Sequence, residues 1–306
     1  MMKSAHKGSK KQALAVAIPV LALFIFFTLS LNPIFAQHQE TQQKEWEDFN
    51  PDLFSHSTNI DNQWFPLKPG TRLTWEGTTI DEEGEAIPHR VVFVVTDLTK
   101  VIGGVRSVVC WDQDYSDGSL EETELVFFAQ DNDGNVWHLG QYPEVYEDGK
   151  LVEAPAWLHG YEDAVAGIMM KAAPKMDAPS YSQGWGPAVG WTDRGMAHQM
   201  GQSVAVPAGS YDDVLVIKEW AKEEPDAFQL KYYAKGVGNI SVGWLGEGEK
   251  TRETLDLVKV EHLDAKAMAE VRKGALQLEK NAYKNSTTVY AHTQPAEPMA
   301  ASHEKH

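Results

Sequence analysis

The sequence predicts a mainly β protein with a single antiparallel curved sheet, arranged as an open barrel or a sandwich, and one C-terminal helix. Three observations lead to this prediction. Asp-Gly pairs, which favour two-residue hairpin turns, stand between apolar runs at residues 117–118, 133–134 and 148–149. Runs of strand length, rich in β-branched and aromatic residues, recur between the turns. No helical periodicity separates these runs, which disfavours a parallel sheet with crossover helices.

The first 36 of the 306 residues are typical of a secretory signal peptide. Four lysines within the first eleven residues precede an uncharged apolar stretch at 13–31, and Ala36 provides a small residue before the expected cleavage point. The alternative is an uncleaved anchor, because an apolar stretch of this length approaches that of a membrane span. Either arrangement predicts an extracytoplasmic protein, periplasmic or secreted, with membrane contact only through an uncleaved N-terminal segment.

Residues 37–45 are rich in Gln and Glu without apolar periodicity, and we expect a spacer there. Residues 46–263 are expected to form one antiparallel β domain, because turn signals and apolar runs alternate throughout this range. The strands are expected at residues 72–80, 90–99, 106–115, 124–130, 136–142, 196–206, 213–221, 228–234, 239–245 and 254–262.

The segment 154–192 differs from the rest of this domain. It is rich in Pro, Gly and Trp with little strand alternation, so we expect a long loop over the sheet. Long loops inside compact domains are often functional, which suggests a lid over a ligand site. The candidate ligand-binding residues in it are Trp157, His159, Trp185 and Trp191.

A helix is expected at residues 264–284, packed on the β domain. Asp264 is a candidate N-cap. The apolar residues after it recur at three- and four-residue steps and form one stripe, which predicts burial against the sheet: Met268, Val271, Ala275, Leu278 and Ala282. Residues 285–306 turn to Pro, Ala, His and Lys, and we expect a disordered tail.

Composition excludes several classes of function. The chain has 44 acidic and 27 basic residues, a net charge of −17 that repels phosphate backbones, so nucleic acid is not an expected partner. The single cysteine, Cys110, excludes an internal disulfide and any multi-cysteine metal site. The sequence contains no Gly-x-Ser-x-Gly motif, phosphate-binding loop or dinucleotide fingerprint.

Acidic residues occur in pairs at two places, where general acid–base chemistry would need two carboxylates that converge on one bond. Glu122 and Glu124 share a strand face and Glu121 lies on the other, while Glu223 and Glu224 stand at a strand end. We interpret these acids as solvated sheet edges, which discourage edge-to-edge aggregation.

Two metal hypotheses stand beside the main expectation that the protein has no cofactor. Met196, His198 and Met200 would share one face of a regular strand, and thioethers with imidazole suit copper(I). Asp131 and Asp133 could contribute to an irregular calcium site, although a hairpin turn explains them more simply.

Several sequence strings resemble a family of exported bacterial β-rich proteins to which no activity is assigned. They include Asn62-Gln63-Trp64-Phe65-Pro66-Leu67-Lys68-Pro69-Gly70-Thr71 and the hairpin Ala129-Gln130-Asp131 with Gly134-Asn135-Val136-Trp137. The resemblance spans residues 46–295 and implies a secreted β-rich domain. It brings no catalytic residue or cofactor.

Together these observations predict an exported, non-catalytic binding protein of the cell envelope. The expected ligand is a small or lipophilic molecule held by a curved sheet under the Trp-rich segment. The alternatives are an extracytoplasmic copper-handling protein that uses Met and His, and a hydrolase with dispersed acidic residues.

Overall fold

The expected strands form one antiparallel sheet in the computed structural model, which describes residues 44–80 and 84–299. These residues belong to one compact unit of the chain, residues 43–306. The expected signal peptide and the last seven residues lie outside the described part. The mainly β prediction is confirmed, with one large sheet and a single α-helix of more than one turn among the described residues.

The strands of the first half of the domain are β1 (Thr71–Ile80), β2 (Ala86–Ile102), β3 (Val105–Ser116), β4 (Ser119–Gln130), β5 (Val136–Glu147), β6 (Lys150–Glu153), β7 (Trp157–Leu158) and β8 (Val165–Met170). Those of the second half are β9 (Tyr181–Ser182), β10 (Gly184–Trp185), β11 (Arg194–Val206), β12 (Gly209–Trp220), β13 (Phe228–Ala234), β14 (Gly238–Leu245), β15 (Thr254–His262) and β16 (Glu297–Pro298). The ten expected strands correspond to β1–β5 and β11–β15.

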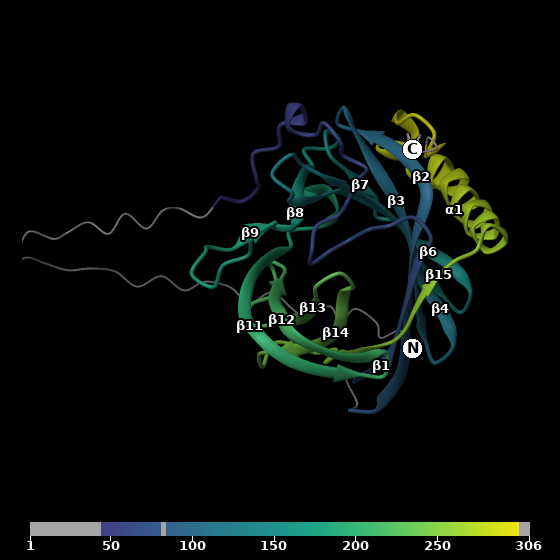
Figure 1. Cartoon of the computed structure of the whole chain (residues 1–306). Helices are drawn as coiled ribbons and strands as arrows, with labels where there is room; N and C mark the ends of the chain where they lie inside the picture. The colour runs from purple at the N-terminus through teal and green to yellow at the C-terminus, as the bar shows by residue number, and fades with distance from the viewer. Residues whose placement is uncertain (1–43, 81–83, 300–306) are drawn as a thin grey trace, which may run out of the picture. The chain divides into compact units, whose positions relative to one another are not determined.

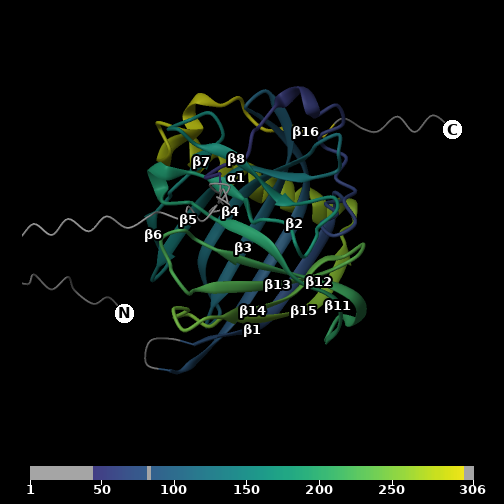
Figure 2. The same cartoon turned by 90° about the vertical axis from the view of Figure 1, so that its left-hand side faces the viewer.

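Hairpin connections order the sheet, because most strands pair with their neighbours in sequence. The order is β10-β8-β5-β4-β3-β2-β1-β15-β14-β13-β12-β11-β9, with β6 and β7 on β5 and β16 on β2. β1 pairs with β15 and so joins the two halves. The sheet curls, so that β11–β14 lie opposite β2–β4 (Figures 1 and 2).

Residues 181–185 bring the two ends of the sheet together. β9 pairs with β11 at one end of the order, and β10 pairs with β8 at the other. Two glycines allow this close approach, because a Cβ on Gly167 would lie 2.2 Å from the backbone nitrogen of Gly184. The ends are therefore neighbours, although the strand ladder is not closed into a barrel.

The helix α1 (Ala265–Asn285) covers the outer face of the first half of the sheet (Figure 1). The carboxylate of Asp264 accepts a hydrogen bond of 2.8 Å from the backbone N–H of Ala267, which confirms the N-cap. All five residues of the expected stripe are buried. Three of them, Ala275, Leu278 and Ala282, join a core that includes Leu125 and Phe127 of β4. No helix in the described part of the chain has the length and apolar character needed to span a membrane.

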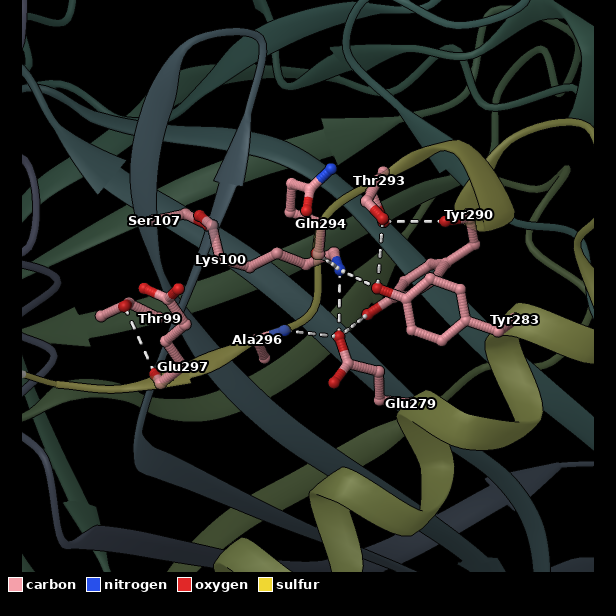
Figure 3. Close-up of polar contacts among 10 residues, drawn as sticks. All are labelled: Thr99, Lys100, Ser107, Glu279, Tyr283, Tyr290, Thr293, Gln294, Ala296 and Glu297. Carbon is pink, nitrogen blue, oxygen red and sulfur yellow. Dashed lines mark hydrogen bonds and ion pairs between the residues drawn. The ribbon is translucent and has the colours of Figure 1, made fainter.

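The expectation of a disordered tail from residue 285 is wrong for residues 286–299. Residues Tyr290–His292 form a 3₁₀ turn, Tyr290 is fully buried, and β16 pairs with β2. One buried cation anchors this segment (Figure 3): the Lys100 ammonium donates to Glu279 Oε1 at 3.0 Å and to the Gln294 carbonyl at 2.6 Å. The polar composition of the segment concealed these specific contacts.

The expectation of a loop at 154–192 is also corrected in part. This segment contains β7–β10, of which β8 and β7 pair with β5 and so extend the sheet. A 3₁₀ turn, Pro187–Val189, follows β10. Most of these strands have only two residues, which is too short for alternation to show in the sequence.

Candidate functional site

A cavity of about 350 Å³ lies on the inner face of the curved sheet, opposite the face that α1 covers. Strands β1–β5 form one wall, and β12–β15 with residues 183–193 form the other. Alternation along β4 explains the two faces. Leu125 and Phe127 pack under the helix, whereas Glu122, Glu124 and Val126 line the cavity.

The inner face changes from apolar to acidic across four neighbouring strands. Strand register places Leu73, Phe93, Asp112 and Glu124 in one row from β1 to β4. The next row contains Trp75, Val91, Asp114 and Glu122 in the same strand order. All eight residues line the cavity. Each row therefore has two apolar residues on β1 and β2 and two carboxyls on β3 and β4.

These carboxyls are held in an environment that disfavours their charge. Burial and the nearby Asp114 raise the pKa of Asp112 and that of Glu122, each to about 7. Burial, with Glu122 and Asp112 close by, raises the pKa of Glu124 well above its usual range. On the opposite wall, burial and the charge of Glu219 raise the pKa of Asp193 to about 6. The interpretation of Glu122 and Glu124 as solvated edge residues is thus wrong.

Two cations neutralise other acids of the cavity. The ring nitrogens of His89 lie 2.5 Å from Asp114 and 2.9 Å from Glu253. Burial opposes the charge of His89, but its interactions with these two carboxylates prevail and raise its pKa to about 10. The ammonium of Lys231 lies 3.1 Å from Glu219 Oε2. Burial likewise opposes its charge, yet the carboxylate of Glu219 keeps the pKa of Lys231 raised.

His138 lies on β5 and faces the same cavity. The residue is only 3% exposed, and neither ring nitrogen has a hydrogen-bond partner of normal geometry. Burial lowers its pKa to about 3 despite nearby carbonyls of Gln183 and Gly140, so the ring is neutral. Its neighbours are aromatic: the ring centroids of Trp157 and Trp191 lie 4.8 and 5.7 Å away.

Of the four expected ligand-binding residues, only Trp191 lines the cavity. Trp157 is 2% exposed and stacks on Trp191 from behind it, with ring centroids 5.9 Å apart. Trp185 packs against Trp46, outside the cavity lining. The Nδ1 atom of His159 accepts a hydrogen bond of 3.1 Å from the backbone N–H of Ala166. This ring therefore stabilises the segment between β7 and β8.

The expected metal residues lie apart from the cavity lining. The carboxylate of Asp131 accepts hydrogen bonds from the backbone N–H groups of Asp133 and Asn135, from the Asn135 amide and from Trp137 Nε1, so it holds the hairpin turn. Asp133 is exposed. Across residues 44–80 and 84–299, no group of three His, Cys, Asp or Glu residues is arranged to hold a metal ion.

A β-bulge interrupts the strand that carries Met196, His198 and Met200. Ala197 pairs with Ile217 and Gln199 pairs with Val216, so His198 is the extra residue of β11. The regular alternation on which the copper hypothesis depends is therefore broken at the histidine. Met200 is exposed, at 38%.

Sequence reasoning missed most of the cavity-lining residues, although a signal for some of them was present. In β4, Glu122 and Glu124 are in phase with Val126 and Phe128, two buried apolar residues. In β3, Asp112 is in phase with the buried Cys110. Acids that share a strand face with buried apolar residues point into a protein, not into solvent. Lys231 and His138 gave no comparable signal.

Comparisons with known proteins give structural similarities only. No protein-family model matches the chain, and no curated protein matches it. A crystal structure of a protein described as exported, with a YmcC-like fold, from Bacteroides fragilis is 12% identical, covers 65% of this chain and 99% of its own, and has a TM-score of 0.39. A lipoprotein from Parabacteroides distasonis is 11% identical, with coverage of 66% and 100% and a TM-score of 0.36. TM-scores below 0.5 do not establish a shared fold.

Proposed function

We propose that this protein is an extracytoplasmic, non-catalytic binding protein that holds a small molecule in the cavity of its curved sheet. The observation that carries this proposal is the cavity itself, because about 350 Å³ of space lies on the inner face of the sheet, whereas protein interiors are normally close-packed. Its volume falls within the range of small-molecule sites, and its wall combines aromatic and aliphatic residues with many convergent polar groups, most of them acidic or amide side chains.

The location outside the cytoplasm rests on the N-terminal sequence alone. A lysine-rich start, an apolar stretch and a small residue at position 36 together favour export with cleavage. A retained anchor would leave the same domain on the outer side of the membrane, so the proposed function does not depend on cleavage.

A hydrolase is the second candidate, because the cavity brings together acids that are scattered in the sequence. Asp112, Glu122 and Glu124 have raised pKa values, as a general acid requires. Binding and hydrolysis differ in their products. A binding protein returns its ligand unchanged after denaturation, and a hydrolase would not.

Filling part of the cavity should weaken binding. Val91 lines the cavity between Trp75 and Asp114, so Val91→Trp would occupy part of the space. We expect the wild type to bind the neutral fluorescent probe N-phenyl-1-naphthylamine. The variant should bind the probe at least about tenfold more weakly, a loss of about 1.4 kcal/mol, because the indole ring occupies space that the probe would fill. Fluorescence titration of both purified proteins measures this.

Val101→Trp provides the matched control, because Val101 lies on the same strand, is 38% exposed and is absent from the cavity lining. It should bind the probe as the wild type does. Equal binding by all three proteins, or no binding by the wild type, would contradict the proposed function.

A further inference from the structure

The cavity has more carboxyls than cations. Among the described residues, the ion pairs of this region join His89 to Asp114 and Glu253, and Lys231 to Glu219. Within the described part of the chain, no ion pair reaches the four other lining carboxyls, which are Asp112, Glu122 and Glu124 on β3 and β4 and Asp193 on the opposite wall. Oε2 of Glu124 is buried without a hydrogen-bond partner.

This arrangement is unfavourable for an empty protein. Asp112 stands directly opposite Glu124 in the β3–β4 pair, and Asp114 stands opposite Glu122. Like charges in directly opposed positions destabilise a sheet, and burial increases the cost of each charge. A ligand that carries a positive charge would remove both penalties at once.

An independent observation also indicates a polar ligand here. His138 of β5 pairs with Phe128 of β4. Glu124 lies four residues before Phe128 and on the same strand face, so His138 and Glu124 share the inner face of the sheet. Its buried, neutral ring has one nitrogen that can accept a hydrogen bond and has no normal partner within the described residues. Across the cavity, Oδ1 of Asn239 is a second buried acceptor that has no hydrogen-bond partner within the described residues. These acceptors suit a ligand with N–H groups.

The apolar half of each row defines the remainder of the ligand. Leu73 and Phe93 continue the row of Asp112 and Glu124, so a molecule that extends across the strands would leave the carboxyls and reach apolar side chains. A bare metal ion would use only the acidic half. The absence of any three-ligand metal arrangement among the described residues fits this distinction.

We propose that the cavity binds a small organic cation, a protonated amine whose ammonium group lies against Asp112, Glu122 and Glu124 and whose apolar part lies against Leu73 and Phe93. This inference rests on the proposed function and adds the chemical class of the ligand. The amine donates hydrogen bonds to the carboxylates, and the aromatic and aliphatic residues of β1 and β2 exclude water from its hydrocarbon part.

Amine binding at this site is linked to proton release. The three carboxyls are partly protonated in the empty protein near neutral pH, because burial raises the pKa of each. A bound ammonium favours their ionised forms, so protons leave as it binds. The affinity should therefore rise between pH 6 and pH 8. The other charged or titratable groups of the lining are Asp114 and His138 on the same wall, and Asp193, Glu219, Lys231, Tyr233 and Glu253 on the opposite wall, with His89 paired to Asp114 and Glu253.

The experiment compares 2-phenylethylamine with 2-phenylethanol, its neutral counterpart of similar size and shape. Isothermal titration calorimetry of the full chain should show at least tenfold tighter binding of the amine at pH 7.5. Titrations in two buffers with different ionisation enthalpies should show net proton release for the amine and none for the alcohol. The variant Asp112→Asn/Glu122→Gln/Glu124→Gln should lose both the preference and the proton release.

Binding of the alcohol by this variant serves as the folding control, because its cavity keeps its size and its apolar wall. Glu121→Gln, on the exposed face of the same strand, should behave as the wild type. Equal affinity for amine and alcohol, no proton release, or competition of the amine by calcium chloride would overturn the amine assignment while leaving the cavity function intact. Failure of both ligands and of the neutral probe would instead reject the proposed function.

Discussion

Replacing Lys100 with methionine is expected to lower the free energy of unfolding by about 3–5 kcal/mol, the usual cost of removing one partner of a buried ion pair. Lys100 is fully buried and Glu279 is 5% exposed. Glu279 Oε1 also accepts from the Tyr290 hydroxyl at 3.2 Å and from the Ala296 N–H at 2.9 Å. The variant therefore leaves a buried carboxylate without its cation and loosens the segment after α1. Urea unfolding at neutral pH measures the change.

The exposed pair Lys235–Asp213 provides the comparison, and Lys235→Met should cost no more than about 1 kcal/mol. Limited proteolysis adds a local readout, since cleavage within residues 286–299 should increase in Lys100→Met alone. A second substitution, Glu279→Leu, should restore part of the lost stability because it removes the stranded charge. Unchanged stability and proteolysis in Lys100→Met would show that the ion pair does not anchor the C-terminal segment.

Neutralising three of the cavity carboxyls that lack an ion pair among the described residues, Asp112, Glu122 and Glu124, is expected to stabilise the protein at pH 8. Asp112→Asn/Glu122→Gln/Glu124→Gln removes groups whose pKa is raised in the folded state to about 7 for Asp112 and Glu122, and further for Glu124. One pKa unit corresponds to about 1.4 kcal/mol. With allowance for the partial exposure of these three carboxyls, we expect the free energy of unfolding of the variant to exceed that of the wild type by roughly 2–4 kcal/mol at pH 8.

The sign follows from proton binding. The folded protein keeps protons on these carboxyls at pH values where the unfolded chain has lost them, so this stabilisation is complete below about pH 4 and is lost as the pH rises through about 7. The raised pKa of His89, about 10, acts in the same direction between pH 6.5 and 10. The free energy of unfolding of the wild type should decrease from pH 6 to pH 8, and that of the triple variant should decrease less.

Urea unfolding at both pH values, with Glu121→Gln as the matched exposed control, measures this difference. An equal fall in the wild type and the triple variant would mean that the cavity carboxyls are not electrostatically strained. Lower stability of the triple variant at pH 8 would contradict the same claim.

Local sequence chemistry was sufficient to predict the strands β1–β5 and β11–β15 and the helix. Asp117-Gly118 and Asp148-Gly149 form the turns between successive strands, and both Asp residues adopt the positive φ that such turns require. The Asp264 cap and the apolar stripe likewise determine α1 from neighbouring residues alone. These signals are local, so no knowledge of the tertiary structure was needed.

The cavity could be predicted only in part, because it depends on which strands meet across the curled sheet. Alternation shows that Glu122 and Glu124 share a face, but not that Lys231 of β13 lies in the opposite wall. The Trp-rich segment was correctly associated with the cavity only through Trp191. Trp157 is instead the support on which Trp191 stacks. Such roles follow from tertiary packing, which composition does not reveal.

Native mass spectrometry of the protein purified from the envelope of its own host tests the central claim most directly. We expect a protein mass that lacks residues 1–36, together with a retained small molecule that leaves unchanged on denaturation. The Val91→Trp variant, purified in parallel, should carry no such molecule. A wild type without any retained ligand, or equal retention by Val91→Trp, would contradict the claim that the cavity is a ligand site.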